Sequence, residues 1–298
     1  MKTDRHFIPL AFLSLLLSSC TNVQDISVYS GTGRSSKPKS SDGSVSEPIL
    51  SGDSKSALSY EEHSPWEGLD YSHFGEQFRT ELKTKILATG NKTIGYSENN
   101  AVLSRSDKAL NGEPGIIPFY HDENQHTTSW NKEHVWPNSR GAGKTGCGAD
   151  PQMLRPTASA CNSSRGNNFY GTGSKEFDPA RCAADSKNGE DFPLYEASRG
   201  EAARIIFYVA AKYGDGVNFK LTNNPGDPTS AKTMGTLRYL IQWNNQYPVT
   251  EQEKRRNDCL DKEGFSRNPF IDDRDLANYI WDEEGLRKDA YVPSATDA

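Results

Sequence analysis

The sequence lacks, at its start, an apolar run long enough to cross a lipid bilayer. After a short basic stretch, residues 7–17 read F-I-P-L-A-F-L-S-L-L-L, and small residues follow. A membrane-spanning helix needs about 20 apolar residues, so this shorter segment predicts an export signal instead. We therefore expect an extracytoplasmic protein.

The end of that segment reads Leu17-Ser18-Ser19-Cys20 and resembles a bacterial lipobox, whose cysteine carries lipid. The resemblance implies that residues 1–20 are a lipoprotein signal peptide and that Cys20 is the lipidation site. It also implies a membrane-anchored chain. The alternative is an ordinary signal peptide with an incidental cysteine.

Cysteine is scarce in this 298-residue chain, which contains five, and no two of them form a C-x-x-C pair. Beyond Cys20 the cysteines are Cys147, Cys161, Cys182 and Cys259. Four cysteines in an exported chain predict two disulfides, and the sequence does not separate the possible pairings. Zinc binding is the alternative, which the wide spacing disfavours.

The sequence also lacks an overall basic charge. It has 34 Lys and Arg residues against 40 Asp and Glu, a formal net charge of −6. Nucleic-acid-binding domains are commonly basic, which argues against such a role for the chain as a whole. The segment 130–170 differs, because its basic residues outnumber its acidic ones. A nucleic-acid site is therefore expected within that segment.

The composition divides the chain into a tether and a folded domain. Residues 21–58 are rich in Ser, Gly, Lys and Asp and show no apolar periodicity. Such a segment cannot bury enough apolar surface to offset the entropy of ordering, which predicts a flexible tether. Residues 59–298 are expected to form one domain, and the protein is expected to be a monomer.

The domain is expected to be of the α+β class, mainly helical with a few strands. Apolar residues at helical spacing predict helices over 71–87, 201–213, 230–245 and 275–281. Thr250 and Glu253 form a capping box that opens a further helix. Short apolar runs predict strands near 116–120 and 130–136, paired with each other. The Gly- and Asn-rich stretch after Asn162, to about Gly189, predicts long loops.

The run W-N-K-E-H-V-W-P at 130–137 places a carboxylate beside an imidazole. A neutral imidazole suits a general base near neutral pH, so His134 is the candidate base. A hard cation such as Mg²⁺ prefers oxygen ligands, so Glu133 and Asn162 are candidate metal ligands. Neighbouring side chains of a regular strand face opposite sides. The strand must therefore bend or end here for both side chains to reach one phosphate.

Basic side chains near this run are candidates for contacts with phosphate, because guanidinium groups pair bidentately with phosphate oxygens. Arg140 and Arg165 are candidate catalytic residues, and Arg155 and Lys144 are candidate substrate-binding residues. Structural roles are the alternative. Each arginine can be an ion-pair partner, His134 a hydrogen-bonded surface residue and Asn162 a helix N-cap.

Several longer runs occur in a fixed order: N-K-E-H-V-W-P, L-R-P-T, N-S-S-R-G-N, W-N-N-Q-Y-P-V-T-E-Q-E-K-R-R-N-D and R-N-P-F-I-D. On these runs the chain resembles the endonuclease I family of exported bacterial nucleases, over roughly residues 59–285. The resemblance implies a His-Me finger (ββα-metal) core with additional surrounding helices. It implies non-specific cleavage of DNA, and often RNA, that leaves 5′-phosphate ends.

The resemblance also implies roles for single residues. His134 corresponds to the general base, and Glu133 and Asn162 to the ligands of Mg²⁺ or Mn²⁺. An arginine in the loop after the histidine stabilises the transition state in relatives. Arg140 is the nearest candidate for that arginine, and Arg165 is the reserve.

Two other functions stay open on the sequence alone. One is a catalytically silent surface lipoprotein that keeps the fold and binds nucleic acid. The other is a structural surface antigen in which the Glu-His pair is incidental. Nucleic-acid cleavage separates the nuclease from both, and binding at low salt separates the two from each other.

Overall fold

The computed structural model describes residues 65–121, 125–171, 191–194, 196–215, 218–223 and 232–281. The predicted signal peptide with Cys20, the predicted tether and Cys182 lie outside the described residues. The helices of the described part are α1 (Gly75–Thr89), α2 (Asn99–Ser106), α3 (Ser159–Arg165), α4 (Arg199–Tyr213), α5 (Leu237–Gln246), α6 (Glu251–Lys262), α7 (Pro269–Asp272) and α8 (Leu276–Trp281). The strands are β1 (Asn131–His134), β2 (Leu154–Thr157), β3 (Phe169–Gly171), β4 (Asp191–Pro193), β5 (Lys220–Leu221) and β6 (Thr233–Met234).

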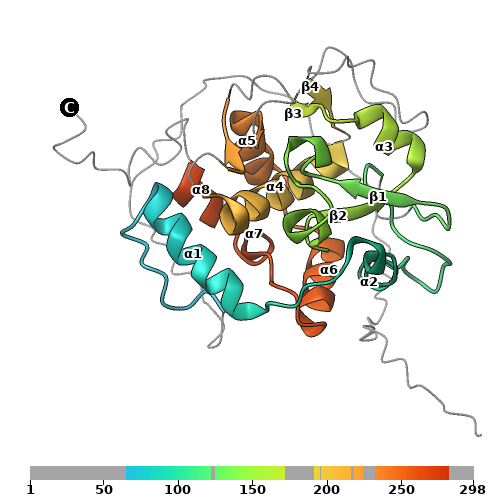
Figure 1. Cartoon of the computed structure of the whole chain (residues 1–298), viewed down its shortest axis with the longest axis horizontal. Coiled ribbons are helices and arrows are strands. Elements are labelled where there is room, and N and C mark those ends of the chain that lie inside the picture. Colours follow the sequence, from blue (N-terminus) through green and yellow to red (C-terminus); the bar gives the residue numbers. More distant parts are fainter. Residues whose placement is uncertain are drawn as a thin grey trace, which may run out of the picture. The chain divides into compact units, whose positions relative to one another are not determined.

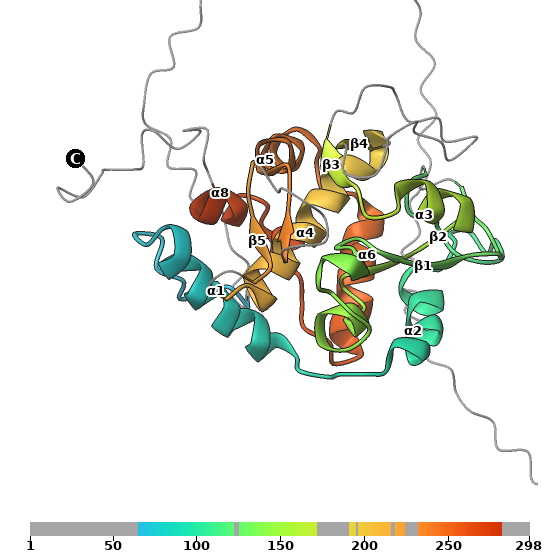
Figure 2. The ribbon, with the colours of Figure 1, turned by 45° about the horizontal axis from the view of Figure 1, so that its top comes forward.

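Helix α4 is the centre of the helical part (Figure 1). It packs against α1, α5 and α7, and its side chains from Ala202 to Ala211 are all buried. A helix that is apolar on nearly all sides is stable only when other elements bury each side. This requirement explains why several helices pack around α4. Figure 2 shows α1, α5 and α8 on the side of α4 away from β1 and β2.

The strands β1 and β2 and the helix α3 lie together beside this helical part (Figure 1). The two strands are antiparallel, with Glu133 opposite Arg155 and His134 opposite Leu154, and α3 packs against β1. The residues that follow β1, Val135 and Trp136, are fully buried and turn the chain into the core. Strand β1 therefore ends at His134.

Most of the predicted helices are confirmed, and so is the α+β class. The capping box is also confirmed, because Glu253 N donates to Thr250 Oγ1 at 3.2 Å and Thr250 N donates to Glu253 Oε2 at 2.9 Å. Helix α5 is shorter than predicted, because Thr233 and Met234 form β6 instead of a first helical turn. The helix α2 had no periodic pattern strong enough to predict it.

The predicted strand pairing is wrong. Ile116 forms isolated bridges with Lys108 and Thr127, while β1 pairs with β2. The run L-R-P-T, which forms β2, was not predicted as a strand because a proline disfavours a central strand. In a two-stranded sheet both strands are edges, so Pro156 is tolerated, and its carbonyl accepts a 2.8 Å hydrogen bond from Phe119 N.

The long loop predicted after Asn162 is wrong at its start, because α3 continues to Arg165. Asn162 lies inside α3, and β3 follows soon after. The helix escaped prediction because serine and asparagine favour caps and turns over helix interiors. Residues 172–190 lie outside the described residues.

The prediction of two disulfides among the four remaining cysteines is wrong. Cys147 has a free thiol that is buried in the hydrophobic core, so it pairs with no other cysteine. A buried thiol packs as a small apolar group, and burial raises the pKa of Cys147 well above its ordinary value. Among the described residues, no helix is both long enough and apolar enough to cross a membrane.

Candidate active site

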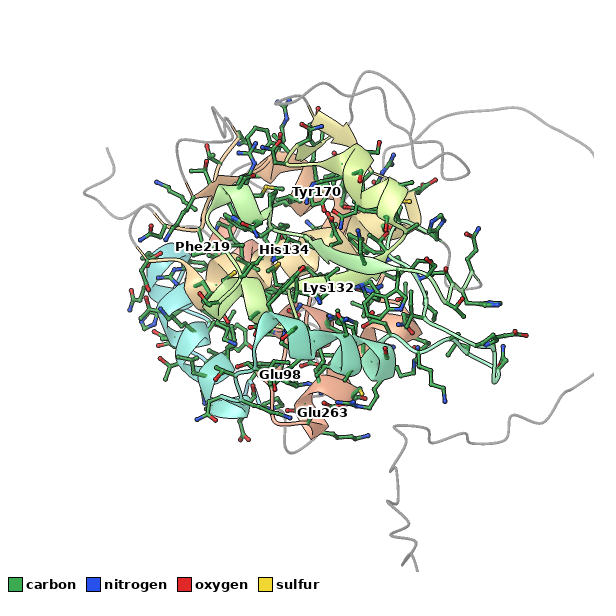
Figure 3. All side chains as sticks on the ribbon, turned by 45° about the vertical axis from the view of Figure 1, so that its right-hand side comes forward. Glu98, Lys132, His134, Tyr170, Phe219 and Glu263 are labelled. Atoms are coloured by element: carbon green, nitrogen blue, oxygen red, sulfur yellow. The ribbon has the colours of Figure 1, made fainter. Side chains whose placement is uncertain are left out.

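One open cavity of about 530 Å³ brings together the three residues predicted to do the chemistry. Glu133, His134 and Asn162 all line it. The other lining residues are Lys132, Pro137, Asn138, Ser139, Gly166 and Asn167. Because β1 ends at His134, the neighbouring Glu133 and His134 side chains reach the same cavity. Figure 3 shows His134 near the middle of this face, with Lys132 beside it.

Glu133 is a buried carboxylate with only 1% of its surface exposed. Its Oε1 accepts a 2.6 Å hydrogen bond from the Tyr120 hydroxyl and a 2.7 Å hydrogen bond from Arg165 Nη1. Burial raises the pKa of Glu133 above its ordinary value, and the opposing effects of Arg165 and Tyr120 only partly offset this. The ionised carboxylate would therefore be stabilised by a further positive charge in the cavity.

Asn162 is fixed to β1 through its amide nitrogen. Nδ2 donates to the Lys132 carbonyl at 3.0 Å and to Asn131 Oδ1 at 2.9 Å. A carbonyl can only accept, so the first of these bonds identifies the donor atom as nitrogen. The Oδ1 atom of Asn162 is thereby left as the atom that can serve as a ligand in the cavity.

The imidazole of His134 is held at one edge by a loop. Its Nε2 atom lies 3.1 Å from the Gly148 carbonyl, in the short 3-10 helix η3 (Gly146–Ala149). Because that carbonyl can only accept, Nε2 carries the proton of the neutral ring and Nδ1 carries the lone pair. Burial lowers the pKa of His134 to about 4, although the carbonyls of Gly148 and Gly143 raise it. The ring is therefore neutral at pH 7, as a general base must be.

Gly148 lies at a place where only glycine fits. A Cβ atom added there would lie 2.0 Å from the Gly143 carbonyl oxygen. The close approach of the two backbones brings both carbonyls to the imidazole. Asp150 fixes the end of this loop, because its Oδ2 accepts hydrogen bonds from Tyr208, Tyr213 and Lys212 on α4, at 2.7 to 2.8 Å.

An aromatic side chain that the sequence did not indicate as a site residue lies beside the candidate base. Tyr96, in the 3-10 helix η1 (Tyr96–Glu98), stacks on His134 with ring centroids 5.2 Å apart and planes inclined by 14°. Lys132 Nζ lies 4.3 Å and Lys144 Nζ 5.7 Å from the centroid of the Tyr96 ring. No motif marks Tyr96, because its role depends only on a contact between distant segments.

Arg165 is fully buried and bonded to the backbone of β1. Besides Glu133, it donates to the carbonyls of His134 and Val135, both at 2.8 Å. Its guanidinium also lies 4.4 Å from the centroid of the Tyr170 ring. These contacts favour a structural role, in which Arg165 joins the end of α3 to the end of β1.

The other predicted basic residues are distributed differently. Arg140 is buried, stacks on Phe169 at 3.5 Å and donates to the Asn167 carbonyl at 2.8 Å, and it does not line the cavity. Arg155 is buried and paired with Asp107 and Glu201. The ion pairs of Arg155 favour a structural role, Arg140 lies outside the cavity lining, and Lys144 is exposed beside Tyr96.

The donors in this cavity fit a hard divalent cation. Among the described residues no group of three or more His, Cys, Asp or Glu could hold a metal. A site of one carboxylate, one amide oxygen and several waters is nevertheless typical of Mg²⁺, which keeps much of its hydration. Glu133 and Asn162 supply that pair of oxygens, and the cavity has room for water.

A buried carboxylate, a neutral imidazole and an anchored amide in one cavity are groups that can serve phosphodiester hydrolysis. Comparison with known proteins agrees with this chemistry. The family model described as Endonuclease I matches residues 74–275. The chain belongs to the endonuclease I family, and it is a nuclease that hydrolyses phosphodiester bonds.

Two curated relatives are similar over most of their length. An extracellular ribonuclease of Bacillus amyloliquefaciens is 33% identical over 216 residues, which cover 68% of this chain and 74% of the relative. An extracellular ribonuclease of Bacillus subtilis (strain 168) is 30% identical over 233 residues, which cover 73% of this chain and 80% of the relative.

Proposed function

We propose that this protein is a metal-dependent endonuclease that cuts DNA or RNA without reading sequence and leaves 5′-phosphate ends. Its core would be a His-Me finger (ββα-metal) unit made of β1, β2 and α3. The observation that carries the proposal is the single cavity lined by Glu133, His134 and Asn162. The names of the two relatives, both extracellular ribonucleases, support RNA as a substrate beside DNA.

His134 acts as the general base in this proposal. Its Nδ1 lone pair takes a proton from a water molecule, and the resulting hydroxide attacks the phosphorus atom as the bond to the 3′ oxygen breaks. The departing 3′ oxygen takes up a proton from solvent water and becomes a hydroxyl. Mg²⁺ or Mn²⁺ held by Glu133 and Asn162 would polarise the phosphate and stabilise the charge that develops on it. Arg165 keeps Glu133 and the backbone of His134 in place during this step.

Binding of the nucleic acid would depend on phosphate contacts. Lys132 lines the cavity and Lys144 is exposed next to it, so both can pair with backbone phosphates. Contacts of this kind carry no sequence information and weaken steeply with salt. Plasmid cleavage at subsaturating substrate should therefore slow between low and moderate salt, and an unchanged rate would contradict this mode of binding.

The direct test compares the wild-type domain with His134→Ala, each with and without a chelator. Cleavage of plasmid DNA and of RNA is expected only for the wild type and only with free Mg²⁺ or Mn²⁺. Full cleavage by His134→Ala would overturn the assignment of the base. Wild-type binding without any cleavage would instead favour the catalytically silent alternative.

We also propose that the protein is a lipid-anchored, extracytoplasmic monomer. The lipobox-like run ending at Cys20 supports the anchor, and the names of the relatives support export. Expression with a labelled fatty acid tests this proposal. Label in the wild type and not in Cys20→Ser is the expected result, whereas an unlabelled wild-type protein would refute the anchor.

A further inference from the structure

His134 has a neighbour that no catalytic assignment includes. The Tyr96 ring lies nearly parallel to the imidazole, with centroids 5.2 Å apart and planes 14° apart. Aromatic pairs with centroids about 4.5 to 7 Å apart in an offset stack are worth about 0.5–1.5 kcal/mol beyond the area they bury. Tyr96 precedes β1 in the chain and approaches the imidazole from outside the ββα unit.

The hydrogen bond to Gly148 does not by itself fix the imidazole. The carbonyls of Gly148 and Gly143 restrain the imidazole at its edge, and the ring can still tilt out of its plane. A flat ring packed against the face of the imidazole removes this remaining freedom. The direction of the Nδ1 lone pair is then set by both contacts together.

We propose that Tyr96 is a positioning residue that fixes the plane of the His134 imidazole and so aims its lone pair at the attacking water. This inference rests on the proposed role of His134 as the base. Tyr96 itself does not line the cavity, so the proposed role is exerted through His134.

Tyr96 is well placed for this role because its own turn is fixed to the loop that holds His134. The buried side chain of Asn99 donates to the Gly95 carbonyl at 3.3 Å and to the Ala149 carbonyl at 2.9 Å. Ala149 directly follows Gly148, the acceptor for His134. Asn99 therefore holds the face contact and the edge contact of the imidazole at a constant separation.

The stack uses the face of the Tyr96 ring and not its hydroxyl. Lys132 and Lys144 also approach the ring, and a phenyl ring attracts a cation in the same way. Phenylalanine should therefore replace tyrosine at this position, while leucine, which is apolar but smaller and not flat, should not. This difference gives the test its conservative variant.

The experiment measures kcat and KM separately for cleavage of a labelled single-stranded oligonucleotide in saturating Mg²⁺. Tyr96→Leu is expected to lower kcat by about 10- to 100-fold at an almost unchanged KM, since small misplacements of a reacting group cost this much. Tyr96→Phe is expected to keep the wild-type kcat. The matched control is Tyr71→Leu, a partly exposed tyrosine that packs on Phe78 and Tyr279 and lies outside the site.

Three results would overturn the inference. A wild-type kcat for Tyr96→Leu would show that the stack is dispensable. A raised KM at constant kcat would make Tyr96 a substrate contact, and an equal loss in Tyr96→Phe would assign the effect to the hydroxyl. Failure of the proposed function looks different, because His134→Ala would then cleave like the wild type whatever stands at position 96.

Discussion

Arg165 donates a 2.7 Å hydrogen bond to Glu133, and both side chains are buried. The same guanidinium donates to the carbonyls of His134 and Val135. One side chain at the end of α3 thus orients the candidate metal ligand and the backbone of the candidate base. Arg165 also neutralises part of the negative charge on Glu133, the same charge that would attract a bound cation.

Replacing Arg165 by methionine should destabilise the fold strongly. The change leaves Glu133 buried without its charged partner, and breaking a buried ion pair in this way costs about 3–5 kcal/mol. Urea denaturation of Arg165→Met measures the loss in the free energy of unfolding. The double variant Glu133→Gln with Arg165→Met should recover part of that loss, because it leaves no unpaired charge. A double variant less stable than Arg165→Met alone would contradict this account.

Asn162→Ala should weaken metal binding more than it weakens the fold. The change removes the Oδ1 ligand, so the Mg²⁺ concentration for half-maximal cleavage should rise by about 10-fold or more. A titration of cleavage rate against Mg²⁺ measures the shift. Asn131→Ala is the matched control, because it removes one anchor of Asn162 and leaves the hydrogen bond to the Lys132 carbonyl. Equal shifts in both variants would argue against Asn162 as a ligand.

Gly148→Ala should abolish most cleavage. The added Cβ would lie 2.0 Å from the Gly143 carbonyl oxygen, so the loop has to move and the acceptor for His134 moves with it. Overpacking of this kind costs about 1–3 kcal/mol of stability. Cleavage rate and thermal unfolding are measured together, with the exposed Thr145→Ala in the same loop as control. Wild-type cleavage by Gly148→Ala would show that the Gly148 carbonyl does not orient the base.

The stability of the domain should fall in acid partly through Asp150. Burial acts to raise the pKa of this carboxyl, but Lys212, Tyr213 and the Gln152 backbone lower it, and the net pKa is below the ordinary value. A lowered folded-state pKa stabilises the fold above the unfolded-state pKa of about 3.9, and this contribution is lost as the pH falls toward the folded-state pKa.

Urea midpoints between pH 7 and pH 3 test this prediction. The wild type should lose stability most steeply at the acid end of this range. Asp150→Asn should be less stable at pH 7 and should show a smaller change with pH. Parallel curves for the two proteins would show that Asp150 does not contribute to the acid sensitivity.

The sequence predicts the parts of the fold that depend on residues close to one another along the chain. The helix α4 follows from apolar residues that recur within one segment, and the start of α6 follows from Thr250 and Glu253. Strand pairing depends on which distant segment lies alongside. For that reason the sequence predicts the wrong partner for β1. The true partner is β2, and its Pro156 argues against a strand when only the sequence is considered.

The sequence by itself determined the chemical groups of the site, because a carboxylate, an imidazole and an amide are properties of residues and their order along the chain. Only the tertiary structure decided where the arginines lie, since Arg140, Arg155 and Arg165 are the same residue type and differ by their buried partners. It also placed Tyr96 on His134. A contact between segments far apart in the chain arises from packing, which no local pattern encodes.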